Sequence, residues 1–282
     1  MDVLGSAARL WRFPVKSMQG EELEAARVTE KGFLGDRAYA LIDTVTGKVV
    51  SAKNPRRWPG LLNFSAEFLR PPTAEDVAPP VRIAFPDGTS LSSDEDAFNA
   101  RASAMFGREV VIRSTPPAKP VLEEYWPDID GLEYREMVTD EAISLGTPSG
   151  TFFDFAAIHI ITTSTVAVLE RAYPQGRFDV RRFRPNILLD TAQNGFPEND
   201  WVGRKLAVGD EVVLQVLIPC ARCVMTTLPQ GDLPLDPGIL RTTARENNVM
   251  IPPLNQRKPS MGVYATVLRG GDVQRSDVVR LI

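Results

Sequence analysis

The sequence predicts a β-rich α+β fold, because short alternating segments and turn residues recur along the whole chain. The 23 prolines and 20 glycines are spread over the 282 residues, and this spacing indicates many short strands separated by turns. Segments such as 8–13 and 211–218 alternate apolar and mixed positions, which is the pattern of half-buried strands. Pro86-Asp87-Gly88 adds a hairpin signal between two further segments of this kind.

Composition and charge exclude several classes of protein. The chain is 43% hydrophobic and long enough for two domains, so a disordered state is not expected. A net charge of −4 predicts no general attraction to nucleic acid or anionic lipid, which makes local groups of basic residues more informative. Residues 1–8 lack the features of a signal peptide, and no stretch approaches the length of a membrane span. We therefore expect a cytoplasmic protein with free thiols, without a membrane or nucleic-acid partner.

The first part of the chain places a loop with Lys16 and Ser17 between two strands. Arg37 follows the turn Gly35-Asp36 and is expected to open a strand. The basic segment 51–58 is expected to be a solvated surface loop. Further strands are expected over 8–13, 21–28, 61–68, 81–85, 89–91 and 110–113, with a helix between Ser93 and Gly107.

A proline-rich segment near the middle of the chain predicts a domain boundary. Pro116-Pro117-Ala118-Lys119-Pro120 has the composition of a stiff linker. We accordingly expect an N-terminal domain over 1–118 and a C-terminal domain over 119–282.

In the second part, a cluster of hydroxyl residues at 162–165 ends a buried strand and opens a helix. The free N–H groups at such a helix start can bind an anion. Pro185 is expected to force an extended backbone on Arg184, so that Arg184 and Asn186 project to the same side. Strands are expected over 156–161, 211–218, 261–268 and 277–282, and helices over 166–173 and 240–247.

The two cysteines of the chain, Cys220 and Cys223, follow the segment 211–218, a strand that Pro219 is expected to end. A strand holds such a cysteine in place, and Arg222 would favour the thiolate form that binds metals. The C-x-x-C spacing also fits a dithiol redox site, and both residues could be ordinary buried thiols. One histidine is too few for the usual structural zinc sites, and two cysteines exclude a four-cysteine iron–sulfur cluster.

Four motifs occur together in one order, and their combination is specific although each alone is weak. They are Phe13-Pro14-Val15-Lys16-Ser17, Gly35-Asp36-Arg37-Ala38-Tyr39, Phe183-Arg184-Pro185-Asn186-Ile187 and Pro219-Cys220-Ala221-Arg222-Cys223-Val224-Met225-Thr226-Thr227. The set resembles the MOSC family, in the branch that has an N-terminal β-barrel domain and includes amidoxime reducers. The resemblance implies a MOSC-type β-barrel domain preceded by a smaller β-barrel-like N-terminal domain, with a molybdenum cofactor between them. It also implies that the second cysteine, Cys223, is the metal ligand and the catalytic residue.

The resemblance further implies cofactor-binding residues from both halves of the chain. The molybdenum cofactor is a pterin with a terminal phosphate and a dithiolene pair. Its site needs a soft thiolate at the metal and ammonium, guanidinium or helix N–H donors at the phosphate. Residues of these types at the matching positions are Lys16, Ser17, Arg37, Thr163, Ser164, Arg184, Asn186 and Arg222.

The resemblance implies a molybdenum-dependent oxidoreductase that reduces N-hydroxylated or related N-oxygenated small molecules. Two cysteines exclude an iron–sulfur relay, and no G-x-G-x-x-G motif follows a strand. Electrons are therefore expected from a separate protein of the ferredoxin, flavin or cytochrome type. The alternative is a protein that carries sulfur as a persulfide, or carries the molybdenum cofactor, without redox turnover.

Overall fold

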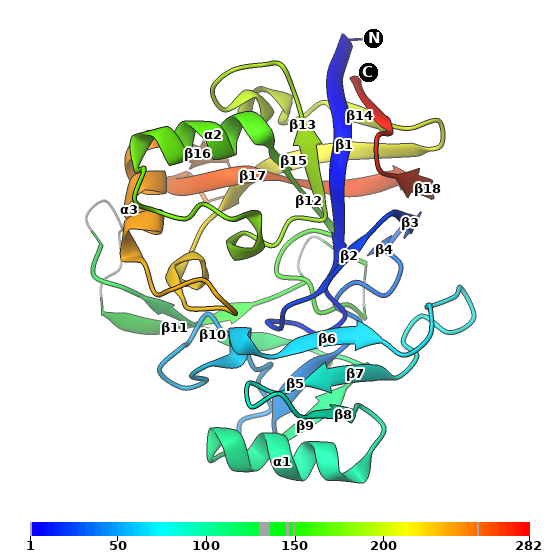
Figure 1. The fold of residues 1–282 in the computed structure, drawn as a ribbon, viewed down its shortest axis with the longest axis vertical. Helices are drawn as coiled ribbons and strands as arrows, with labels where there is room; N and C mark the ends of the chain where they lie inside the picture. Colours follow the sequence, from blue (N-terminus) through cyan, green and yellow to red (C-terminus); the bar gives the residue numbers. More distant parts are fainter. Residues whose placement is uncertain (1, 130–135, 145–146, 149, 253) are drawn as a thin grey trace.

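The main feature of the computed structural model is a closed barrel of seven strands, which occupies the upper half of Figure 1. The model describes residues 2–129, 136–144, 147–148, 150–252 and 254–282. In order around the barrel the strands are β12 (Ile158–Thr162), β13 (Ile187–Asp190), β1 (Asp2–Arg12), β19 (Val278–Leu281), β14 (Lys205–Val208), β15 (Val212–Ala221) and β17 (Gln256–Arg269). β17 pairs again with β12, which closes the barrel. β12 and β13 run parallel and the other neighbours antiparallel, so the predicted β-rich class is confirmed.

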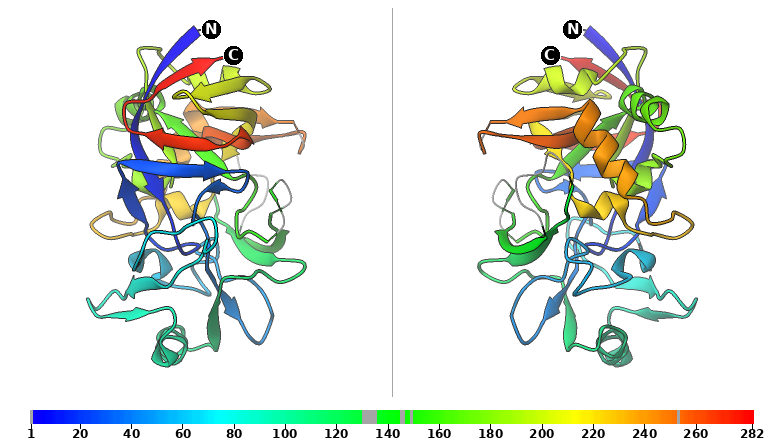
Figure 2. Two further views of the ribbon diagram at one scale, coloured as in Figure 1. Left: turned by 90° about the vertical axis from the view of Figure 1, so that its right-hand side faces the viewer. Right: turned by 90° about the vertical axis from the view of Figure 1, so that its left-hand side faces the viewer.

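The first strand of the chain belongs to this barrel and not to the sheets that follow it in sequence. β1 pairs with β13, where Ser6 lies opposite Asp190, and with β19, where Asp2 lies opposite Leu281. The two ends of the chain therefore lie close together, as the views show (Figures 1 and 2). A domain boundary at 118/119 stays a prediction, and these pairings cross it.

Smaller sheets occupy the lower half of Figure 1, and one further small sheet lies beside the barrel at the right of the view. In the described part of the chain they are β10 (Val121–Trp126) with β11 (Met137–Ala142), β18 (Gly271–Gln274) with β3 (Ala25–Thr29) and β4 (Gly32–Phe33), β5 (Ala40–Asp43) with β9 (Val110–Arg113), and β6 (Ser65–Phe68) with β7 (Val81–Ala84) and β8 (Ser90–Ser92). β2 (Glu21–Leu23) pairs with β1, and β16 (Asn248–Ile251) pairs with β17. The β7–β8 hairpin is the one that Pro86-Asp87-Gly88 predicts.

Three α-helices lie within the described residues, close to the predicted positions. α1 (Asp96–Phe106) ends at Gly107, whose φ of 60° is the left-handed value that favours glycine. α2 (Thr163–Ala172) is capped by the side chain of Thr162, a member of the predicted hydroxyl cluster, and α3 (Pro237–Glu246) packs beside it (Figure 1). None of the helices in this part of the chain is long and apolar enough to span a membrane.

The barrel and the N-terminal sheets have separate hydrophobic cores. Val212, Leu214 and Val216 alternate along β15 and point into the barrel core, as their spacing predicts. The core of the N-terminal sheets is rich in aromatic residues and contains the tilted pair Phe64 and Phe85, whose ring centroids are 5.3 Å apart. Two cores leave a seam between them, and the candidate site lies at this seam.

Some predicted strands were wrong in detail. Pro219 does not end β15, because the register between β15 and β17 shifts on both sides of it, and such irregular positions tolerate a residue without an N–H. Segment 61–68 begins with a 3-10 turn at Leu61–Asn63, before β6. Segment 21–28 divides at Glu24 into β2 and β3, which pair with different neighbours.

Candidate functional site

A cavity of about 300 Å³ is lined by residues from both parts of the chain. Seven of the nine residues predicted for the site line it: Lys16, Ser17, Arg37, Arg184, Asn186, Arg222 and Cys223. The loop between β1 and β2 carries Lys16 and Ser17, and the loop between β4 and β5 carries Arg37. The segments before β13 and after β15 carry the others. Residues far apart in sequence but predicted to share one site therefore meet in one place.

Thr163 and Ser164 are the two predicted site residues that do not line this cavity. The Thr163 hydroxyl donates to Asp190 at 3.0 Å, and the Ser164 hydroxyl donates to the carbonyl oxygen of Gly195 at 2.9 Å. Both hydroxyls thus hold the start of α2 against the segment that follows β13.

Cys223 is the cysteine that faces the cavity. Cys220 is fully buried, whereas Cys223 is half-buried and forms the N-cap of the 3-10 turn Val224–Thr227. Burial, reinforced by Glu124, raises the pKa of Cys223 to about 12. Lys53 lowers this pKa by a smaller amount and Arg222 by less still, so the predicted thiolate is not favoured by the protein alone. A bound metal would have to displace the thiol proton.

Arg222 acts on the other cysteine. Its Nη1 donates to Cys220 Sγ at 2.7 Å, and its Nη2 donates to the carbonyl oxygen of Phe183 at 3.0 Å. The remaining donor, Nε, is buried and has no hydrogen-bond partner among the described residues. A buried donor of this kind is costly unless a ligand satisfies it.

Three of the cavity residues have backbone conformations that are rare for non-glycine residues. The φ angles of Ser17, Arg37 and Arg184 are 63°, 50° and 56°. The extended conformation predicted for Arg184 is therefore wrong, because its tertiary contacts outweigh the preference that Pro185 imposes. Strain of this kind gathers at functional sites, where surrounding contacts hold it in place.

Arg37 and Arg184 come from different parts of the chain and stack on the same aromatic ring. Their guanidinium carbons lie 4.4 Å and 4.2 Å from the ring centroid of Phe13. Arg184 Nη1 donates to the carbonyl oxygen of Met18 at 2.5 Å, whereas its Nη2 is buried without a partner among the described residues. Burial and the nearby Arg37 lower the pKa of Arg184 to about 9. Arg37 pairs with Asp36, which also accepts a hydrogen bond of 2.8 Å from Asn186.

A chain of four charged side chains beside Cys223 was not predicted. Lys16 Nζ donates to Asp154 and, at 2.7 Å, to the carbonyl oxygen of Phe152. Lys53 lies 3.0 Å from Glu124 and 3.6 Å from Asp154. Burial would lower the pKa of Lys53, but the two carboxylates raise this pKa well above its usual value. Burial would likewise raise the pKa of Asp154, and the two lysines hold it well below its usual range.

Lys53 belongs to the basic segment 51–58 and corrects its predicted role. The segment was expected to be a solvated surface loop, yet Lys53 is largely buried and lines the cavity. Its partners lie 71 residues away at Glu124 and farther still at Asp154, so no local pattern indicated the contact.

The cavity carries an excess of positive charge. Seven lysines and arginines line it, against three carboxylates, Glu124, Glu141 and Asp154. The chain as a whole has a net charge of −4, so this excess is local. Together with the unpaired donors of Arg184 and Arg222, it fits an anionic group such as a phosphate. The thiol of Cys223 at the same cavity fits a soft metal.

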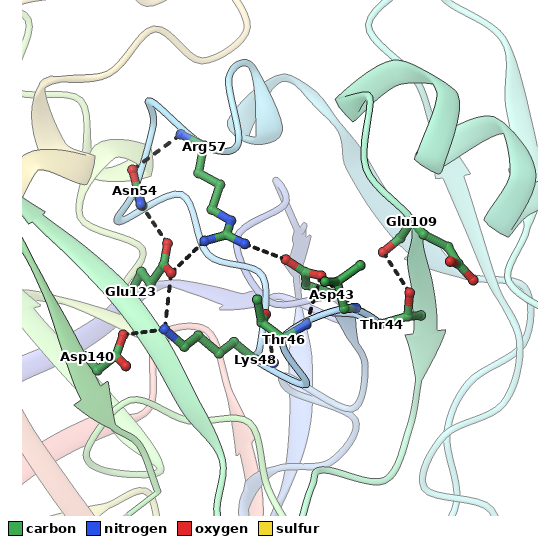
Figure 3. Close-up of polar contacts among 10 residues, drawn as sticks. Asp43, Thr44, Thr46, Lys48, Asn54, Arg57, Glu109, Glu123 and Asp140 are labelled. Carbon is green, nitrogen blue, oxygen red and sulfur yellow. Dashed lines mark hydrogen bonds and ion pairs between the residues drawn. The ribbon is translucent and has the colours of Figure 1, made fainter.

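A second group of charged residues lies on the other side of β10 and is drawn in Figure 3. Arg57 donates to Glu123 at 2.6 Å and to Asp43 at 2.9 Å. Lys48 donates to Glu123 at 3.1 Å and to Asp140 at 2.6 Å. Arg57 Nε is buried without a hydrogen-bond partner among the described residues, but three carboxylates surround the two basic groups, so the excess charge here is negative and disfavours a further anion.

The fold and the cavity together define a two-lobed barrel protein with a cavity lined by an excess of basic residues beside a thiol. Family models agree with this class: the MOSC N-terminal beta barrel domain matches residues 4–110, and the MOSC domain matches residues 147–280. The two matches together span most of the chain, which belongs to the MOSC-domain family. The predicted family is thereby confirmed.

Several known proteins are similar over nearly the whole chain. Mitochondrial amidoxime reducing component 2 of Bos taurus is 22% identical over 294 residues, which cover 98% of this chain and 83% of that protein. Its Homo sapiens counterpart is 23% identical over 298 residues, with the same coverage. The crystal structure of the YuaD protein from Bacillus subtilis is 10% identical, with a TM-score of 0.45, and the match covers 98% of this chain and 94% of that one.

Proposed function

We propose that this protein is a molybdenum-cofactor-dependent reductase of N-hydroxylated or related N-oxygenated small molecules. The observation that carries the proposal is a cationic cavity, with Cys223 at its wall, between the two MOSC lobes. The similarity to proteins named mitochondrial amidoxime reducing component 2 supports this choice of substrate.

The residues of the cavity would hold the cofactor at two ends. Cys223 Sγ would bind the metal, and the unpaired Nη2 of Arg184 and Nε of Arg222 would donate to the phosphate or pterin. Lys16 and Arg37 add positive charge from two loops in the N-terminal part of the chain. When bound, the cofactor supplies two-electron redox chemistry at its metal.

Reduction of an N-hydroxy group consumes two electrons and two protons, breaks the N–O bond and releases water. Lys53 Nζ keeps its proton, because Asp154 and Glu124 raise its pKa well above the usual value. Lys53 would therefore provide a fixed positive charge beside Cys223 and not a proton. Buried aromatic walls, such as Phe153 and Phe183, would restrict water in the inner part of the cavity.

Electrons would come from a separate protein of the ferredoxin, flavin or cytochrome type. The protein would act in the cytoplasm on a small molecule, without nucleic acid or membrane.

The chain should be produced in a host that makes the molybdenum cofactor, and its molybdenum and released pterin should be measured. Loaded protein should reduce benzamidoxime with a reduced viologen as donor and should not oxidise NADH or NADPH alone. Molybdenum-loaded protein that is inactive on N-hydroxy, N-oxide and S-oxide compounds would instead support a carrier of cofactor or persulfide.

A further inference from the structure

Arg182 is the largest fully buried side chain among the described residues, with 1% of it exposed. Its guanidinium is held by backbone carbonyl groups of three separate segments. Nε donates to Arg177 at 3.0 Å, Nη1 to Thr226 at 3.2 Å and to Leu228 at 3.1 Å, and Nη2 to Pro234 at 2.8 Å. Two of the four acceptors lie in or directly after the 3-10 turn that begins at Cys223.

This turn connects Arg182 to the thiol. The carbonyl oxygen of Cys223 accepts hydrogen bonds from Thr226, from its backbone N at 3.2 Å and from its hydroxyl at 3.0 Å. Thr226 thus links the carbonyl group that Arg182 holds to the backbone of Cys223. Fixing Thr226 fixes the C-terminal side of Cys223.

The neighbour of Arg182 also holds Arg222, the residue on the N-terminal side of Cys223. Phe183, the neighbour of Arg182, accepts a hydrogen bond of 3.0 Å from Arg222 Nη2, and the backbone N of Arg222 donates to Pro259 at 2.7 Å. Residues on both sides of Cys223 are therefore tied to 182–183. Arg182 is also among the residues that line the cavity into which Cys223 faces.

We propose that Arg182 is a positioning residue that fixes the turn after Cys223 and so sets the place of its sulfur in the cavity. Arginine is required because its planar fork reaches acceptors in several directions, whereas the single ammonium group of lysine does not. The proposal rests on the proposed function in one respect, that the sulfur is held for a metal. The geometry around the thiol can be tested without a metal.

The test compares the reactivity of the two thiols in the full-length chain made without cofactor. Iodoacetamide would be added to the wild type, Arg182→Lys and Arg182→Met, and alkylation would be followed by mass spectrometry. Trypsin cleaves after Arg222, so Cys220 and Cys223 fall in different peptides and are measured separately. Cys220 is fully buried and reports general loosening of the fold.

Both variants should alkylate Cys223 about tenfold faster than the wild type, the factor that corresponds to about 1.4 kcal/mol, with little change at Cys220. The control is Arg181→Lys, because Arg181 is the adjacent arginine but forms surface ion pairs with Asp179 and Asp232. The control should leave both rates unchanged. Equal acceleration of both thiols, or an unchanged Cys223 rate in folded Arg182 variants, overturns the proposal.

If the Arg182 variants do not fold, a milder variant tests whether the turn that Arg182 holds positions Cys223. Thr226→Val removes the hydroxyl that joins the held carbonyl group to Cys223 while keeping the side-chain shape. It should accelerate alkylation of Cys223 by a smaller factor, and an unchanged rate contradicts the proposal. The molybdenum content of the loaded wild type is measured in parallel. Wild type that binds no molybdenum refutes the proposed function, whereas the thiol ratio decides the role of Arg182.

Discussion

Two groups of charged residues lie back to back on β10, and they differ in the sign of their excess charge. Glu123 and Glu124 are consecutive, so their side chains point to opposite faces of the strand. Glu123 joins the outer group drawn in Figure 3, with Arg57 and Lys48. Glu124 joins the inner group through Lys53.

The difference separates a structural network from a binding site. In the outer group both terminal nitrogens of Arg57 are paired with carboxylates, and acidic groups outnumber basic ones. In the inner group basic residues outnumber acidic ones. Buried donors without a partner among the described residues occur in both groups, namely Nε of Arg57 in the outer group and Nη2 of Arg184 and Nε of Arg222 in the inner group, so the sign of the excess charge is what distinguishes the groups. An excess of buried positive charge is unfavourable without an anionic partner, so the inner group is the one that calls for a ligand. Substitutions should accordingly affect cofactor binding on one face and stability alone on the other.

The largest effect should come from Cys223→Ala. The variant should fold and contain no molybdenum, because the soft ligand at the cavity wall is lost. Metal analysis of the purified protein checks this result. Cys220→Ala is the matched control and should keep most of the metal, since Cys220 is bonded to Arg222 and does not line the cavity. Equal loss of metal in both variants would show that the two cysteines share the role.

Asp154→Asn should destabilise the cofactor-free protein by about 3 kcal/mol, because it leaves Lys16 buried without its carboxylate. The Asp154 side chain is 32% exposed, which keeps the expected cost at the lower end of the range for buried pairs. Denaturant unfolding measures the change. A cost below ~1 kcal/mol would mean that solvent in the cavity screens the pair.

Arg184→Met should weaken cofactor retention by about tenfold or more, because hydrogen bonds to charged groups contribute about 1.5–3 kcal/mol. Retention can be followed as molybdenum remaining after repeated gel filtration. Arg57→Met is the matched control from the outer group and should retain cofactor like the wild type. Retention that falls equally in both variants would remove the distinction between the two groups.

His159 makes the inner wall sensitive to pH. Burial, together with the positive charge of Arg222, lowers the pKa of His159 to about 3, against about 6.5 in an unfolded chain. Between these values the unfolded chain binds a proton that the folded chain does not, so stability falls as pH falls. From pH 6.5 to 5 the loss should reach about 1.6 kcal/mol. The chain has one histidine, so His159→Gln should remove this part of the pH dependence in denaturant titrations.

The smallest effect should come from Arg57→Met in the outer group. It should lower the free energy of unfolding by about 1 kcal/mol, because Arg57 is partly exposed and Asp43 keeps its bonds from the backbone N–H groups of Val45 and Thr46. Unfolding in urea measures the change. A change in molybdenum content with this variant would argue against the separation of the two faces.

The sequence predicted those parts of the structure that depend on local pattern. The alternation along 211–218 placed Val212, Leu214 and Val216 in the barrel core, and Gly107 ended α1 as expected. The motifs with Lys16, Arg37 and Cys223 identified residues that meet at one cavity. Residue type and order were sufficient for these.

The contacts between side chains in the cavity could not be predicted from local sequence patterns, because they join residues that are far apart in the chain. Lys16 and Asp154 are 138 residues apart, and neither neighbourhood in sequence marks the other as a partner. The backbone of Arg184 departs from the preference set by Pro185 because Met18, 166 residues away, accepts its hydrogen bond. The helix start at Thr163 had the right chemistry for an anion, but its hydroxyl is satisfied within the fold.

The place of β1 in the barrel has a consequence for synthesis on the ribosome. β1 can pair early with β2, but only over Leu10–Arg12, and its other neighbours, β13 and β19, are made much later. The backbone groups of β1 that pair with β19, between Asp2 and Ser6, therefore stay unpaired until β19 is translated, while the N-terminal sheets can already pair. An unpaired strand edge is open to association with other chains during this interval. Barrel closure is thus a late event, because it needs β19.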